Sequence, residues 1–131
     1  MDNFLETGQA KRITNQYEEW KVQRIKEPGW FPIFNEFVDD ELLKKLSGNG
    51  LKLYIYLGIH SKNDTGVSWH SIKTIAKYFG KSERTISTWI EELIKNGLIE
   101  RIQPERTSSS VTFLKPYGRR NENDKENTNI D

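Results

Sequence analysis

The residues best suited to chemistry in this sequence are lysines, arginines and hydroxyl side chains, and they concentrate in its second half. Residues 71–120 carry ten basic and five acidic side chains, a net charge of +5, although the whole chain has a net charge of only +1. Lysine and arginine bind phosphate oxygens, and arginine also donates paired hydrogen bonds to a guanine edge. These residue types therefore predict contact with a polyanion such as a nucleic acid.

Other kinds of chemistry lack the residues that they need. The chain has no cysteine, which excludes disulfides and thiolate metal sites. His60 and His70 do not have a metal-ligand spacing. Asp39, Asp40 and Glu41 are adjacent at a helix start and face different directions. We find no glycine-rich phosphate loop and no nucleophile–base pairing, so we expect no metal, no cofactor and no enzymatic activity.

The chain offers no signal for a membrane or for export. No apolar stretch approaches the ~20 residues that a transmembrane helix requires, and residues 1–10 lack the charged-then-apolar layout of a signal peptide. We therefore expect a cytoplasmic protein without a membrane partner.

Two short helices joined by a brief turn must position the basic side chains. Ser71 and Ser82 stand at the two helix starts, where a hydroxyl accepts a hydrogen bond from a first-turn N–H. Gly80 ends the first helix, because glycine adopts the left-handed conformation most easily. We expect the following side chains to face inward: Ile72, Ile75, Ala76 and Phe79 in the first helix, and Ile86, Ile90, Leu93 and Ile94 in the second.

The remaining elements frame this helix pair. We expect Trp30 and Trp69 in the core, and Trp89 packed beneath the hairpin rather than stacked on a base. A short helix capped by Asp39 or Asp40 should turn Leu42, Leu43 and Leu46 inward, and the next should bury Leu51, Tyr54, Ile55 and Leu57. The expected segments are helices over 14–25, 38–46 and 47–60, extended pieces over 30–37 and 67–69, and strands over 98–102 and 111–114 around a tip at 104–110.

At this point the sequence resembles a known pattern. SIKTIAKYFGKSERTISTWI at residues 71–90 resembles the bacterial winged-helix pattern S-x-x-x-I-A-x-x-x-G-x-S-x-R-T-V, and ELIKNGLI at 92–99 resembles its ending. Residues 29–57 are similar to the N-terminal domains of replication initiators from Gram-positive plasmids and phages. The chain departs from full-length initiators, which continue into a further domain where this chain has a short polar tail. The resemblance implies a mainly α fold with a small β wing, a winged helix-turn-helix.

In such a fold the second helix of the pair presents its N-terminal side chains to the major groove. Arg84 is the candidate for guanine O6 and N7, Ser87 and Thr88 for bases or phosphates, and Thr85 for the backbone. Glu83, like Glu91, either rejects phosphate, accepts from cytosine N4 or holds Arg84 in place. The full set of predicted DNA-contacting residues is Ser71, Lys73, Lys77, Lys81, Ser82, Glu83, Arg84, Thr85, Ser87, Thr88, Arg101 and Arg106.

The sequence thus predicts three regions: an amphipathic arm over 1–28, a winged helix-turn-helix over 29–117 and a disordered polar tail over 118–131. The predicted partner is double-stranded DNA, read sequence-specifically by a transcriptional regulator of a plasmid or mobile element. The alternatives are a replication initiation or accessory protein, and a winged helix that binds a protein partner without reading DNA. Residues 13–25 either join two copies in a homodimer or fold back on the domain.

Overall fold

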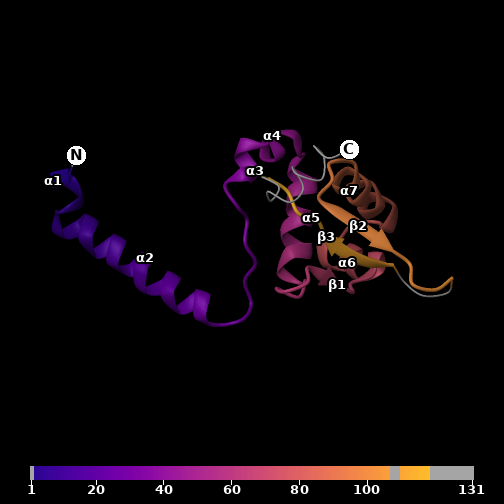
Figure 1. The fold of residues 1–131 in the computed structure, drawn as a ribbon, viewed down its shortest axis with the longest axis horizontal. Coiled ribbons are helices and arrows are strands. Elements are labelled where there is room, and N and C mark those ends of the chain that lie inside the picture. The colour runs from indigo at the N-terminus through magenta and orange to yellow at the C-terminus, as the bar shows by residue number, and fades with distance from the viewer. Residues whose placement is uncertain (1, 107–109, 119–131) are drawn as a thin grey trace, which may run out of the picture. The chain divides into compact units, whose positions relative to one another are not determined.

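The computed structural model describes residues 2–106 and 110–118, and the chain divides into two compact units, Met1–Trp30 and Phe31–Asp131. The first unit contains helices α1 (Asp2–Leu5) and α2 (Gly8–Lys26), and the second contains all other elements (Figure 1). Most of the predicted polar tail lies outside the described residues, as does part of the predicted tip of the hairpin.

Helix α2 begins at Gly8, six residues before the expected start at Thr14. The reason is a side-chain cap, because Thr7 Oγ1 accepts a hydrogen bond from Ala10 N at 3.3 Å. After the helix, Trp30 Nε1 donates a 3.0 Å hydrogen bond to the Ile25 carbonyl. Trp30 is exposed, so its predicted place in the core was wrong. Its indole N–H instead binds a carbonyl group in the last turn of α2.

Two one-turn helices, α3 (Glu36–Asp39) and α4 (Leu42–Lys45), replace the single helix expected over 38–46. Asp40 ends α3 rather than starting a helix, and Glu41 follows with a left-handed φ of 61° that interrupts the helical path. Leu42 and Leu46 are buried as predicted, but Leu43 is exposed because the break rotates it outward.

Helix α5 (Gly48–Ile59) runs through the core of the second unit and packs on α7 (Glu83–Lys95) and strand β3 (Val111–Leu114). Its buried face is wider than the predicted stripe: Leu53, Tyr54, Tyr56 and Leu57 are all buried. Ile55, predicted to be inside, is exposed. Since α5 is covered on several sides, helical spacing alone did not identify its solvent side.

Three short strands form an antiparallel sheet in the order β1-β3-β2, with β1 at Val67–Ser68 and β2 at Ile99–Ile102. Strands β2 and β3 make the predicted wing, and β1 pairs with the other edge of β3. Helices with this small sheet confirm the winged helix-turn-helix fold (Figure 1). Within the described part of the chain, no helix is both long and apolar enough to cross a membrane.

A carboxylate from α7 holds the start of α5. Glu92 accepts hydrogen bonds from Ser47 N at 2.7 Å and from Ser47 Oγ at 2.6 Å. Ser47 Oγ in turn accepts from Gly50 N at 3.0 Å, so the N-cap of α5 is itself fixed by α7. No local pattern indicates this contact, because the two partners are 45 residues apart in the chain.

We expect Glu92→Ala to lower the free energy of unfolding by about 1–2 kcal/mol, because it removes two charge-assisted hydrogen bonds at a helix start. Glu91→Ala is the matched control: Glu91 is the adjacent, exposed carboxylate, and its removal should stay within about 0.5 kcal/mol. Urea unfolding of both variants measures the difference. Equal losses in the two variants would show that the Glu92–Ser47 contact contributes nothing specific.

Candidate nucleic-acid interface

A tight turn joins α6 (Ile72–Phe79) to α7. Gly80 has a left-handed φ of 66°, and Lys81 N donates to the Ala76 carbonyl at 3.0 Å while Gly80 N donates to Lys77 at 3.4 Å. This pair of bonds closes the end of α6 as a Schellman motif. The turn therefore delivers the chain directly to the N-cap of α7, as the two capped helices predicted.

Serine hydroxyls cap both helices of the pair. Ser71 Oγ accepts from Thr74 N at 3.1 Å, and Ser82 Oγ accepts from Thr85 N at 3.1 Å. Ser82 Oγ also donates to Thr85 Oγ1 at 2.9 Å. Both serines are thus caps before any ligand is present, and an anion at these helix starts would meet their remaining N–H groups.

The inner face of α7 is apolar. Ile86, Ile90 and Leu93 are buried as predicted, but Ile94 is exposed. Trp89 takes the inward place instead, buried edge-on against Phe79 of α6 at a ring-centroid distance of 5.4 Å. The buried face of α7 is therefore rotated toward Trp89. The cause is Phe79, which lies on another helix, so the periodicity of α7 does not reveal it.

The outer face of α7 begins with the polar residues that the sequence singled out. Glu83, Arg84 and Thr88 are exposed, and Thr85 and Ser87 are half-buried. Thr88 Oγ1 is engaged in a 3.2 Å hydrogen bond to the Arg84 carbonyl. Hydroxyls on this face are thus partly occupied by the helix itself, which leaves Arg84 as its principal donor.

Arg84 is not held by a neighbouring acid. The two ion pairs found among the described residues, Lys11–Glu6 and Arg24–Glu27, both lie in the first unit. Neither Glu83 nor Glu91 is therefore within 4.0 Å of the Arg84 guanidinium, so the structure does not show the third of their three alternative roles, holding Arg84 in place. The exposed guanidinium keeps its donors for an external acceptor.

The predicted phosphate-binding lysines are exposed and follow α6 and its turn. Lys73 and Lys77 are four residues apart on α6 and so share one side of the helix. Lys81 lies in the turn. None of the three makes an ion pair within the described ranges, so their charge is available to a polyanion.

A groove of about 350 Å³ brings together residues from the starts of both helices and from the wing. It unites four predicted contact residues that are up to 30 positions apart in the chain. The residues that line it are Ser71, Ile72, Lys73, Glu83, Arg101, Gln103 and Ser110.

Arg101 lies partly inside this part of the sheet rather than projecting from the tip of the wing. Its register partner on β3 is Thr112, which also pairs with Ser68 on β1, so the three residues form one row across the sheet. Arg101 Nη1, Thr112 Oγ1 and Ser68 Oγ are each buried without a hydrogen-bond partner among the described residues. Burial lowers the pKa of Arg101, which nevertheless stays charged at neutral pH. The wing therefore has a buried polar row, of which Arg101 alone also lines the groove.

Arg106 is exposed beyond β2, and its carbonyl accepts a 2.9 Å hydrogen bond from Gln103 Nε2. Of the tip expected at 104–110, residues 107–109 lie outside the described residues, and Ser110 lines the groove.

A cluster of two histidines and two tyrosines lies between α5 and α6, and no pattern in the sequence indicated it. His60 and His70 have ring centroids 4.4 Å apart, and the Tyr56 hydroxyl and His70 Nδ1 are joined at 2.7 Å. Burial raises the pKa of the Tyr56 hydroxyl, with Tyr78 adding to the effect, so it stays protonated. No three acidic, cysteine or histidine side chains gather as a metal site in the described chain.

This cluster predicts a loss of stability in mild acid. Burial, and then His60, lower the pKa of His70 below its ordinary 6.5. The unfolded chain therefore binds a proton at this residue more tightly than the folded chain, and the stabilisation present above pH 6.5 is lost as pH falls below it. Unfolding free energies measured against pH should show a shallower slope for His70→Gln than for the unchanged protein, above the range where carboxylates titrate. An unchanged slope would remove His70 as its source.

Next to this cluster, Trp69 was wrongly predicted to lie in the core: it is 66% exposed. Strand alternation is the reason. Ser68 is fully buried, so the side chain that follows it points to the opposite side.

The comparisons with known proteins agree with this geometry. A family model described as a helix-turn-helix domain matches residues 44–99, the span from α4 to the first residue of β2. No curated protein and no solved structure gave a match, so the resemblance to replication initiators gains no relative in its support. Residues 44–99 are thus similar to a helix-turn-helix domain, in agreement with the pair formed by α6 and α7.

Proposed function

We propose that this protein binds double-stranded DNA sequence-specifically, with α7 in the major groove. The observation that carries the proposal is the exposed start of α7, where Arg84 has no carboxylate partner within the described residues and stands on a helix capped by Ser82. A guanidinium held in this way matches the paired acceptors O6 and N7 of guanine. Lys73, Lys77 and Lys81 would add phosphate contacts that strengthen binding without reading sequence.

The solvent side of α7 favours DNA over a protein partner. A helix used for protein binding would present apolar side chains, whereas the exposed residues over the first three turns of α7 are all polar: Glu83, Arg84, Thr88 and Glu91. Ile94 is the exception, and it lies in the last turn. We therefore retain the alternative of a protein-binding winged helix only as an outcome of the test.

The process that we propose is transcriptional regulation on a plasmid or other mobile element, by binding and not by catalysis, in the cytoplasm. One winged helix makes few phosphate contacts, so single-site affinity would be modest. We accordingly propose that two copies bind one operator, with residues 13–25 as the contact between them.

Selection from a random duplex pool with the full chain tests the proposal. We expect an enriched motif, and a salt titration on that duplex in which log affinity falls by about 0.9 per phosphate contact for each unit of log salt. A pool without any enriched sequence, together with a nearly flat salt dependence, would exclude the regulator and favour a protein-binding role.

A further inference from the structure

A narrow apolar line follows one side of helix α2. Ile13, Tyr17 and Trp20 recur at intervals of four and three residues, and Arg24 continues the spacing. All four are exposed, and the Tyr17 and Trp20 rings lie 5.7 Å apart as one continuous surface. The preceding position on the same line, Ala10, is buried within its own surroundings. The first unit therefore leaves the line open from Ile13 onward.

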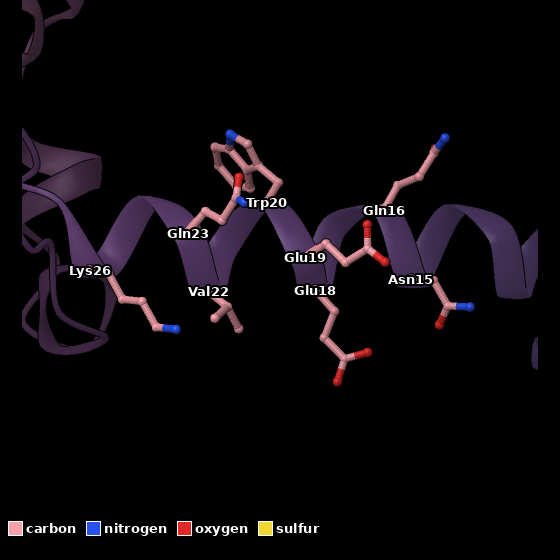
Figure 2. Close-up of a pocket in the computed structure, with 8 residues that line it drawn as sticks. All are labelled: Asn15, Gln16, Glu18, Glu19, Trp20, Val22, Gln23 and Lys26. Atoms are coloured by element: carbon pink, nitrogen blue, oxygen red, sulfur yellow. The ribbon is translucent and has the colours of Figure 1, made fainter.

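The g flank of this line carries no charge. In a heptad with Tyr17 at a and Trp20 at d, the g positions that border the line are Gln16 and Gln23. Figure 2 shows Gln16, Trp20 and Gln23 projecting from one side of α2, while Glu18 and Val22 project from the other. Lys21, at the e position of the same heptad, therefore meets no like charge at the g positions of a second copy.

The width of the apolar line also indicates what kind of surface packs against it. A helix that packs on a globular surface presents a broad stripe, whereas a line restricted to a and d positions is the seam of a coiled coil. Val22 and Ile25 fall at f and b, off the line. The depression among the side chains of residues 15–26 runs along a single helix and so does not enclose a small molecule.

The charge on the line is neutralised locally. Arg24 Nη2 donates to Glu27 Oε2 at 2.9 Å, so the a-position guanidinium carries its own counter-ion. A single polar residue at an a position fixes the register of two helices. Arg24 therefore favours pairing in which it meets its own copy.

We propose that α2 pairs with α2 of a second copy as a parallel, in-register two-stranded coiled coil through Ile13, Tyr17 and Trp20. In this arrangement Gln16 of one helix faces Lys21 of the other, since a g residue meets the e residue of the next heptad. The parallel direction rests on the proposed function, because it places both DNA-binding units after the same end of the pair, as paired half-sites require.

Pairing over so short a helix is weak, and so it depends on protein concentration. Binding of two adjacent half-sites raises the effective concentration of the second copy. The free chain should therefore be in a monomer–dimer equilibrium, and the operator-bound form should be a dimer.

Sedimentation of the full chain without DNA tests the pairing. The mass should rise from 15.4 kDa toward twice that value with concentration. Trp20→Glu should raise the dissociation constant at least about 100-fold, because it removes two large aromatic contacts per dimer. Val22→Glu, a matched control with the same added charge at a residue 50% exposed against 57% for Trp20, should sediment as the unchanged protein does. Circular dichroism confirms that each variant keeps its helices.

Gln16→Glu tests the direction of the helices. In the parallel pair the new carboxylate faces Lys21 of the second copy, so the dissociation constant should fall roughly threefold. No tightening, or weakening, would overturn the parallel arrangement.

A mass of 15.4 kDa at every concentration would overturn the pairing, and so would equal effects of Trp20→Glu and Val22→Glu. A monomer whose thermal stability falls in Trp20→Glu would show that α2 packs on its own chain. Because these masses are measured without DNA, they leave the DNA-binding proposal intact. Conversely, a protein that bound DNA without any sequence preference would still give the same masses.

Discussion

Replacing Arg84 by alanine should weaken binding to the preferred duplex by about 1–3 kcal/mol, roughly 5- to 150-fold, and should abolish discrimination at one base pair. The physical reason is that Arg84 offers an exposed guanidinium near the start of α7 with no acid to satisfy it. Quantitative binding to duplexes with all four pairs at each position measures both effects.

Two variants separate base reading from charge. Arg84→Lys keeps the charge but loses the planar pair of donors, so specificity should fall almost as far as in Arg84→Ala. Lys77→Ala removes one exposed cation from α6, so it should weaken all duplexes alike and lower the salt slope by about one. If Arg84→Ala and Lys77→Ala had the same uniform effect, α7 would not be the base-reading face.

Gly58→Ala should destabilise the second unit by about 1–3 kcal/mol, the reverse of the usual effect of this change in a helix. Alanine normally favours a helix by about 1 kcal/mol over glycine. At Gly58, however, a Cβ atom would overlap the ring of Phe31, which packs directly on the backbone of α5. Because Phe31 also contacts Tyr54 edge-on at 6.0 Å, it cannot move without disturbing the core.

Gly48→Ala provides the control in the same helix. A Cβ atom at Gly48 meets no atom within 4 Å, so its effect on the free energy of unfolding should be neutral or slightly favourable. Phe31→Leu combined with Gly58→Ala should recover part of the loss, because the smaller side chain makes room for the methyl group. A Gly58→Ala protein as stable as the original would show that Phe31 does not rest on α5.

The helix pair and the wing were predictable because their signals are local. Ser71, Gly80 and Ser82 act within four residues of themselves through caps and a left-handed turn, and the structure has all three as expected. The end of α7 and the two strands that follow it are likewise indicated by short sequence patterns. A hydrogen bond to a near neighbour depends little on the rest of the fold, so the sequence reveals it.

Three of the errors, at Ile94, Ile55 and Trp69, share one cause, which is that helical or strand spacing does not say how many sides of an element are covered. Ile94 is exposed because Trp89 takes the inward place against Phe79. Ile55 is exposed because α5 buries its other sides, and Trp69 because Ser68 is the residue that points inward. In each case the deciding neighbour belongs to another element or to the opposite face.

The sequence by itself therefore determined the fold of residues 71–106 and 110–114, its caps and its basic character, since these depend on short-range patterns and composition. Only the tertiary structure decided which side chains meet across long separations. It joined Glu92 to Ser47 and His60 to His70, and it set Arg101 in a groove with Ser71. These contacts arise when α5, α6, α7 and the sheet pack around one core, and no periodicity within a single element records where its partners will lie.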